Sequence, residues 1–221
     1  MQMSYDKGYR GVGMEGRVAA WYAKNTLRDI AEFQTLADRL TKDLPAGARI
    51  LEVAPGPGYL SIELAKHGQY RITGLDISKT FVEIATENAR RASLKIDFQQ
   101  GNASAMPFRK DAFDFIVCRA AFKNFSQPAA AMNEMYRVLR PGGRALIIDL
   151  RKDASMNDID TYIDGARLGW ANSLIYKLTF RYMLIPRAYS KQQFRDMASL
   201  SEFGDAEIGE SGIGVEITLV K

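Results

Sequence analysis

The sequence predicts an α/β fold: a seven-stranded, mostly parallel sheet with helices on both faces and an antiparallel hairpin at its C-terminal end. Between residues 49 and 150, short runs of strand-forming residues alternate with stretches of helical spacing. These strands are apolar almost throughout, which is typical of parallel strands buried on both faces. The last two strand-like runs are joined by a short glycine turn, so they predict the hairpin.

The pattern of apolar residues identifies each expected element. Helical spacing predicts helices over residues 12–23, 27–40, 59–66, 79–92 and 129–139, and a long helical stretch over 156–197. Strand-forming runs predict strands over residues 49–54, 70–76, 94–99, 112–119, 144–150, 206–211 and 214–220. The right-handed crossover rule arranges them as a doubly wound, Rossmann-like sheet. Since no repeat, low-complexity segment or boundary divides the chain, we expect one domain over residues 1–221.

Composition excludes several classes of protein. With 47% hydrophobic and 25% charged residues, the chain is expected to be globular and not disordered. The formal charge of +4 is spread without a basic stripe, so we expect no nucleic-acid partner. Cys118 and His67 are the single residues of their kinds, which excludes an intrachain disulfide and a His/Cys zinc cluster.

The apolar residues 174–186 are interrupted by Lys177 and Arg181, so they do not predict a membrane span. The N-terminus lacks the apolar core of a signal peptide. These features predict a cytoplasmic protein with no stable membrane insertion.

A loop between the first strand and the following helix is the main candidate site. It contains Gly56 and Gly58, and glycines there allow close backbone approach while the helix N-terminus offers N–H groups to a carboxylate or phosphate. Asp76 follows Gly58 by 18 positions, at the tip of the second strand, where a carboxylate accepts bonds from both ribose hydroxyls of a nucleotide. NAD-binding domains have the same pair of features.

Three further features distinguish this loop from a general nucleotide site. Glu52 precedes it by two residues, the chain ends in a hairpin, and the segment 101–108 follows the third strand. Together these features resemble the class I methyltransferases that depend on S-adenosylmethionine (SAM), over residues 50–150 and the terminal hairpin. The resemblance implies SAM as cofactor and S-adenosylhomocysteine (SAH) as product.

The resemblance also implies roles for single residues in cofactor binding. The family's E/D-x-G-x-G-x-G loop falls on Glu52, Ala54, Gly56 and Gly58, with Ala54 replacing the first glycine and narrowing the room for the methionine moiety. Asp76 falls on the residue that binds the ribose.

Four more positions complete the implied cofactor site. Ile77 would flank the adenine, and the Ala103 N–H would face its ring. Asn102 stands where many members have Asp, and its side-chain carbonyl can accept the same hydrogen bond from the adenine amino group. Arg119 falls where the family holds the methionine end of the cofactor, often through a main-chain carbonyl.

Residues 121–125 and 133–143 look like the ubiquinone/menaquinone C-methyltransferase branch of methyltransferase type 11. Lys123 and Asn124 stand where that branch has an Arg-Asn pair, and they either face the methyl group or cap a turn. The C-terminal third departs from the branch. The resemblance therefore implies a small-molecule acceptor without assigning a quinone.

Methyl transfer from a sulfonium is an in-line displacement, in which positioning and desolvation contribute most. A general base is needed only if the acceptor arrives protonated. We take Asp149, Tyr22, Lys123 and Asn124 as catalytic candidates, with Glu15 and Asp164 as further bases. No metal ligands are expected, so the hypothesis is metal-independent transfer.

The flanking segments are expected to build the acceptor site. In this family, segments like residues 1–45 commonly form a lid over the cofactor, and we expect residues 152–198 to be a helical insert that roofs a partly hydrophobic small molecule. A competing interpretation is that the insert is an amphipathic helix on a membrane surface. The sequence is also compatible with a homodimer.

Two other functional classes stay open: an NAD(P)-dependent oxidoreductase, and a SAM-binding protein that is non-catalytic or catalyses different chemistry. Simpler structural roles also compete at single residues. Asp76 would then cap the next helix, Cys118 would be a core residue, and His67 a surface or capping residue.

Overall fold

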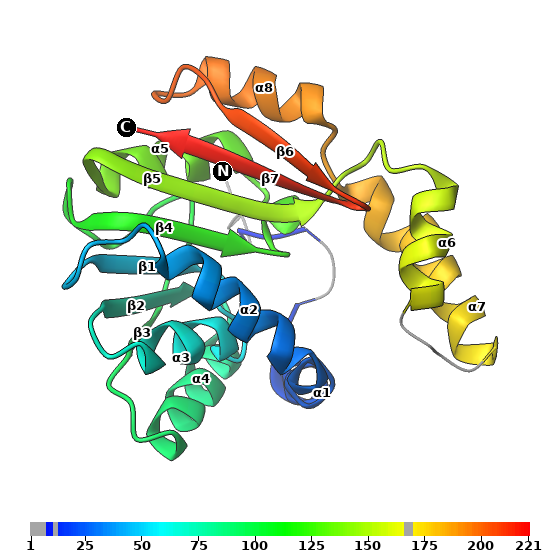
Figure 1. The fold of residues 1–221 in the computed structure, drawn as a ribbon, viewed down its shortest axis with the longest axis horizontal. Helices are drawn as coiled ribbons and strands as arrows, with labels where there is room; N and C mark the ends of the chain where they lie inside the picture. Colours follow the sequence, from blue (N-terminus) through cyan, green and yellow to red (C-terminus); the bar gives the residue numbers. More distant parts are fainter. Residues whose placement is uncertain (1–7, 11–12, 166–169) are drawn as a thin grey trace, which may run out of the picture.

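The computed structural model describes residues 8–10, 13–165 and 170–221. In this part of the chain, one seven-stranded sheet has the order β3-β2-β1-β4-β5-β7-β6 (Figure 1). The strands are β1 (Arg49–Val53), β2 (Arg71–Asp76), β3 (Asp97–Gln100), β4 (Phe113–Arg119), β5 (Leu139–Leu150), β6 (Glu207–Ser211) and β7 (Gly214–Val220). The predicted fold class is confirmed.

Strand direction places the candidate site. Strands β1 to β5 pair in parallel, whereas β7 is antiparallel to both β5 and β6. The strand order reverses between β1 and β4, which lie side by side. Loops that leave the carboxyl ends of such neighbouring strands diverge to opposite faces and open a crevice, the usual ligand site of this fold.

Helices connect the strands and extend beyond their carboxyl ends. They are α1 (Gly16–Thr26), η1 (Leu27–Asp29), α2 (Ile30–Thr41), α3 (Tyr59–Lys66), α4 (Lys79–Arg91), η2 (Phe122–Asn124), α5 (Pro128–Val138), α6 (Met156–Gly165), α7 (Trp170–Thr179), η3 (Phe180–Leu184), η4 (Ile185–Arg187) and α8 (Lys191–Leu200). Figure 1 shows α1, α6 and α7 beyond the carboxyl ends of the parallel strands.

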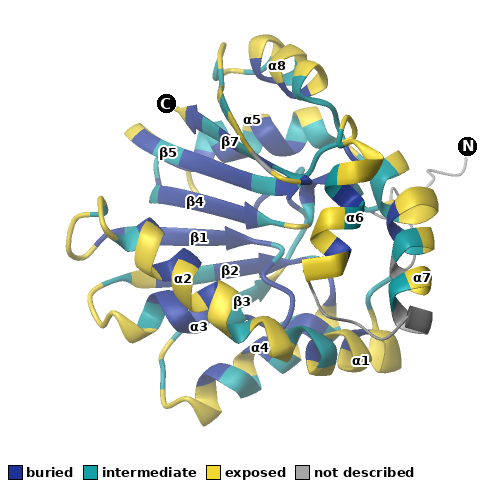
Figure 2. Cartoon of the chain, turned by 45° about the vertical axis from the view of Figure 1, so that its right-hand side comes forward, coloured by how far each residue is buried: buried dark blue, intermediate teal, exposed yellow. Residues whose placement is uncertain are grey.

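Alternating side chains of the central strands bury both faces of the sheet. Ile50 packs in one cluster with Phe33 of α2 and residues of α3, while the adjacent Leu51 packs in another with Met132 of α5 and Phe194 of α8. Both central-strand residues are fully buried. Figure 2 shows the buried central strands between exposed helical surfaces. Helices therefore cover both faces, as predicted.

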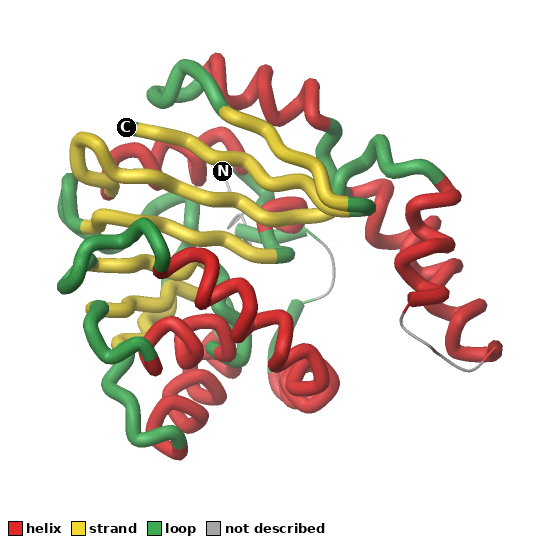
Figure 3. The backbone as a smooth tube through the Cα atoms, viewed as in Figure 1, coloured by secondary structure: helices red, strands yellow, loops and turns green. Residues whose placement is uncertain are grey.

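The C-terminal helical region differs from its prediction. The expected continuous stretch over 156–197 is divided into α6, α7, the π-helical η3, the 3₁₀-helical η4 and α8 (Figure 3). Pro186 lacks the backbone N–H that a continuing α-helix would use, and the chain turns to an extended conformation at Ala188, after η4. Ser190 then starts α8 through a capping box with Gln193, a polar signal that apolar periodicity does not contain.

Two smaller differences affect the other helices. The N-terminal helices begin and end a few residues later than expected, at Gly16–Thr26 and Ile30–Thr41, with η1 between them. Helix α5 ends at Val138, before Pro141-Gly142-Gly143, and Leu139 already pairs with Phe113. The proline–glycine segment lies inside β5, at an irregularity in its pairing with β4.

Gly58 offers a test of the packing between the loop and α4. It has φ +79°, and a Cβ there would lie 2.9 Å from the Ala85 Cβ and 2.8 Å from the Phe98 ring. Gly68 has a similar φ of +76° but no atom within 4 Å of its Cβ position. Gly58→Ala should therefore lower the free energy of unfolding by about 1–3 kcal/mol more than Gly68→Ala, measured by urea denaturation. Equal losses would show that the contact with α4 is loose.

Candidate functional site

The loop after β1 has the left-handed backbone conformations that a tight strand-to-helix turn requires. Ala54, Gly56 and Gly58 have φ values of 57°, 55° and 79°, and Gly58 is the N-cap of α3. Gly56 borders open space, since only the Phe81 ring tip comes within 4.0 Å of its Cβ position. A left-handed backbone costs alanine about 1–2 kcal/mol. A glycine in place of Ala54 would adopt the same conformation without this cost.

Asp76 joins the tip of β2 to this loop. Its Oδ2 accepts the Gly56 N–H at 2.9 Å, and its Oδ1 accepts the Ser78 N–H at 2.9 Å. The carboxyl is 5% exposed, and burial raises its pKa to about 6 although the N–H groups favour the charged form. Ser78, and not Asp76, caps α4, because its hydroxyl accepts the Phe81 N–H. The helix-cap interpretation of Asp76 is therefore wrong.

Glu52 lies behind the loop, toward α3. The Ser61 hydroxyl donates to its Oε2, and burial raises its pKa to about 7 although hydrogen bonds from Ser61 oppose the shift. The carboxyl therefore contacts the helix that follows the loop, and this contact fixes the loop relative to α3.

Ile77, Asn102 and Ala103 lie at the outer end of the same edge. Asn102 Oδ1 accepts the Ser104 N–H at 2.9 Å, and Ala103 packs in the core beneath. A Cβ on Gly8 would come within 2.4 Å of Ile77 Cδ1 and 2.9 Å of Asn102 Nδ2, so the Gly8 backbone packs directly against both side chains. Sequence reasoning missed Gly8, which stands outside any motif.

The segment around Gly8 also contacts the loop after β4. The Arg10 N–H donates to the Asn124 carbonyl at 2.6 Å, and the Arg10 side chain binds the Phe125 carbonyl and the Tyr189 hydroxyl. These contacts link three distant parts of the chain across the carboxyl edge of the sheet.

Arg119 ends β4 and directs its side chain to α2. Its guanidinium donates to Glu32 at 2.9 Å and lies 4.5 Å from the centre of the Phe33 ring. The following residue, Ala120, has a left-handed φ of 57°. The Arg119 side chain therefore links the tip of β4 to α2, while the Arg119 main chain lies at the carboxyl edge of the sheet.

Lys123 and Asp149 form a buried ion pair beside this edge. Their Nζ and Oδ1 atoms are 2.8 Å apart, with side chains 7% and 1% exposed. Asp149 also accepts the backbone N–H groups of Lys123 at 2.9 Å and Leu150 at 2.8 Å, while Lys123 Nζ donates to the Ala120 carbonyl at 2.6 Å. The pair connects η2, which ends at Asn124, to the tip of β5.

The N-terminal candidates lie near α4. Tyr22 makes an edge-to-face contact with Phe81, with ring centres 5.8 Å apart, so it stands near the glycine loop. Glu15 accepts the N–H groups of Lys79 and Thr80 at 3.0 Å each. Burial works against its ionisation, but these N–H groups with the Thr80 and Ser78 hydroxyls lower its pKa. Glu15 therefore stabilises the start of α4.

Asp164, the other base considered, lies on α6. Its carboxylate is 3.6 Å from Lys177 Nζ and is largely exposed.

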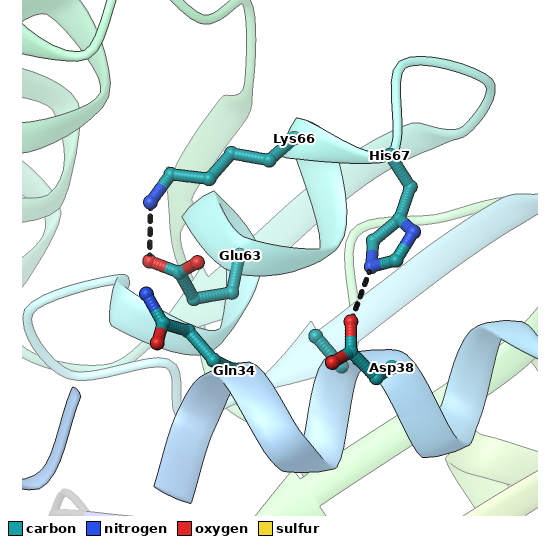
Figure 4. A pocket seen from close by; sticks show the side chains of 6 residues that line it. Gln34, Asp38, Glu63, Lys66 and His67 are labelled. Atoms are coloured by element: carbon teal, nitrogen blue, oxygen red, sulfur yellow. Dashed lines mark hydrogen bonds and ion pairs between the residues drawn. The ribbon is translucent and has the colours of Figure 1, made fainter. Parts of the chain in front are cut away.

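A polar cavity of about 360 Å³ lies between α2 and α3, away from the carboxyl edge. The ion pair of Lys66 with Glu63 lines it, and His67 Nε2 lies 3.3 Å from Asp38 Oδ1 (Figure 4). His67 caps the end of α3 opposite Gly58, as predicted. Cys118 is fully buried, which raises its thiol pKa and confirms it as a core residue.

In the described ranges, no group of three or more metal-binding side chains gathers, and no helix is long and apolar enough to cross a bilayer.

Comparison with known proteins finds relatives of the central part of the chain. Residues 51–147 match the family model of a methyltransferase domain. A demethylmenaquinone methyltransferase from Deinococcus radiodurans is 35% identical over 108 residues, which cover 48% of this chain and 45% of the relative. A demethylmenaquinone methyltransferase from Chlorobaculum tepidum is 33% identical over 148 residues, which cover 66% of this chain and 59% of the relative. The chain thus spans about half the length of the curated relatives it matches.

Solved structures extend the likeness beyond the central segment. A putative SAM-dependent methyltransferase from Methanococcus maripaludis superposes with a TM-score of 0.73 over 96% of this chain and 95% of the other, at 22% identity. A [4+2]-cyclase shares the fold with a TM-score of 0.61 and 25% identity, over 81% and 61% of the chains. Residues 51–147, which include the glycine loop and Asp76, are thus similar to a methyltransferase domain, and the chain shares the fold of these solved structures.

Proposed function

We propose that this chain binds SAM at the carboxyl edge of the sheet and transfers its methyl group to a small, partly hydrophobic acceptor. The observation that carries the proposal is the Asp76 carboxylate bound to the Gly56 N–H beside the N-terminus of α3, within the matched domain. A buried acid next to an open glycine turn offers acceptors to the ribose and N–H groups to the methionine carboxylate.

The surrounding residues fit the rest of the cofactor. The space at Gly56 admits close approach of a ligand, and Glu52 fixes the loop through Ser61. Ile77, Asn102 and Ala103 would hold the adenine at the outer end, with Gly8 above them. Ala54, Gly58 and the main chain at Arg119 would surround the methionine end. When bound, SAM supplies an electrophilic methyl group on a sulfonium.

The catalytic candidates divide by their contacts. Asp149 and Lys123 neutralise each other and hold η2, so we propose that they position the loop carrying Asn124. Tyr22 lies near the glycine loop through its contact with Phe81, so we propose it as the candidate that an incoming acceptor would meet. Because Asp149 and Lys123 are paired with each other, we expect the site to act mainly by orienting the acceptor and excluding water.

The acceptor site is proposed between the flanking segments. Residues 1–45 would form its lid and residues 152–198 its roof, both parts of one domain over residues 1–221. Tyr22 of α1 and Phe81 of α4 pack edge to face near the glycine loop and would give this site aromatic walls. A partly hydrophobic small molecule suits such walls. The two relatives described above are named demethylmenaquinone methyltransferases. A quinone precursor is therefore one class of acceptor that these walls would suit.

A second candidate function is different chemistry on the same cofactor fold. The [4+2]-cyclase among the structural neighbours supports this second candidate, because that enzyme has the same fold. The oxidoreductase hypothesis gains no support from the matched family, which is a methyltransferase domain.

Ligand-dependent thermal stability tests the cofactor. SAH should raise the melting temperature in proportion to the logarithm of its concentration above Kd, whereas NADH should leave it unchanged. Methyl transfer from radiolabelled SAM to a compound in cell extract would then separate a methyltransferase from the second candidate. Stabilisation by NADH alone would refute the proposal.

The role of Asp76 is tested by Asp76→Asn. The amide still accepts one N–H bond but offers fewer acceptors to the ribose, so SAH affinity should fall about 10- to 100-fold by calorimetry. Because the pKa of Asp76 is about 6, wild-type affinity should weaken as the pH falls below this value and the carboxyl gains a proton. Asp43→Asn, an exposed residue between α2 and β1, is the control. Equal affinity of the Asp76 variant would remove Asp76 from the site.

Asp149→Asn tests the buried pair. It leaves the Lys123 charge without its partner, so stability should fall by about 3 kcal/mol and turnover with it, while SAH affinity persists. The double variant Lys123→Met/Asp149→Asn should recover much of the stability, since no buried charge stays unpaired. Unchanged turnover in the single variant would show that the pair does not position the reacting groups.

A further inference from the structure

Helix α7 and the adjoining η3 expose a row of large apolar side chains. Leu174, Ile175, Leu178 and Tyr182 are 53%, 59%, 47% and 64% exposed. Their spacing of three, four and seven residues places them along one side of the helix, and we call this set the α7 arc. Contiguous apolar surface is seldom left exposed on a monomeric protein, because its contact with water is unfavourable. The exposure of the α7 arc therefore indicates a partner that covers it.

The α7 arc is not needed to hold α7 in the fold. Phe180, on another side of the helix, packs with Ile159 and Ile163 of α6. Lys177 binds Asp160 at 3.0 Å and Asp164 at 3.6 Å on the same helix, α6. The α6–α7 hairpin is therefore closed by these contacts, and the arc stays available.

Charge indicates the kind of partner. From Gly165 to Arg195 the sequence has six Lys or Arg residues and no Asp or Glu. Arg181 borders the arc, with its guanidinium 5.5 Å from the centre of the Tyr182 ring. On the adjoining helix α6, Asp160 and Asp164 are paired with Lys177. Leucines and a tyrosine flanked by a basic, acid-free segment suit the boundary between acyl chains and anionic headgroups.

A second exposed apolar surface lies at the same end of the molecule. On α1, Trp21 is 67% and Val18 43% exposed, next to the basic Arg17 and Lys24. Figures 1 and 2 show α1 and α7 both beyond the carboxyl ends of the parallel strands. A flat surface that met both helices would cover the carboxyl edge of the sheet, which we call the mouth of the candidate site.

We propose that the α7 arc docks on an anionic lipid bilayer and holds the mouth of the site against the membrane surface. Helix α7 has 10 residues, a rise of about 15 Å, so it lies in the interface and does not cross a bilayer of about 30 Å. A second copy of the chain suits the arc less well. Two identical basic, acid-free segments would face each other across a twofold axis and repel.

Vesicle co-sedimentation tests the proposal directly. The full chain should pellet with vesicles of equal phosphatidylglycerol and phosphatidylcholine, and about fivefold less with phosphatidylcholine alone or in high salt. Leu174→Ser/Leu178→Ser should weaken the partition by about tenfold or more, because two exposed apolar groups no longer enter the bilayer. The matched control is Leu200→Ser, an 86% exposed leucine on α8, which should bind as the wild type does.

Several outcomes would overturn the docking. One is wild-type protein that stays in the supernatant with anionic vesicles, and another is undiminished binding of the double variant. A wild-type dimer that the double variant converts to a monomer, seen by light scattering, would assign the arc to a second copy. SAH binding measured in parallel keeps the two proposals apart, since the arc variants should bind SAH normally whether or not the membrane proposal holds.

Discussion

The hydrogen bond from the Gly56 N–H to Asp76 is the contact on which the candidate site depends. It joins the loop of β1 to the tip of β2 and fixes the left-handed turn that starts α3. Burial makes this carboxyl costly to ionise, as its pKa of about 6 indicates. A carboxylate kept in that position is useful to a ligand that brings hydroxyl donors, and the surrounding loop is open where such a ligand would lie.

A similar arrangement stands on the other side of the strand-order reversal. Asp149 at the tip of β5 accepts the backbone N–H of Lys123, in the loop after β4, much as Asp76 accepts an N–H from the loop after β1. Each half of the carboxyl edge is thus fixed by a buried acid on one strand tip that binds the neighbouring loop. The difference is the cation: Lys123 neutralises Asp149, whereas Asp76 has backbone N–H partners. This asymmetry is the physical reason for assigning ligand binding to Asp76 and positioning to Asp149.

The parts of this account that the sequence predicted are those with local signals. Apolar runs located the five parallel strands and the hairpin, and helix α3 matches its prediction at both ends. The adjacency of Gly56 and Asp76 followed from their places at neighbouring strand tips. By contrast, the Lys123–Asp149 pair and the contacts of Gly8 join residues far apart in the chain, which no local pattern encodes. Glu15 was considered as a base, but its contact with the first N–H groups of α4 depends on tertiary packing.

The central claim, that Asp76 and the glycine loop bind the nucleoside of SAM, is tested most directly by a crystal structure of the protein with SAH. Both ribose hydroxyls should lie within hydrogen-bonding distance of the Asp76 carboxylate, with the adenine beside Ile77 and Asn102. A ribose bound elsewhere, with the contact between Asp76 and Gly56 unchanged and no ligand beside it, would contradict the account.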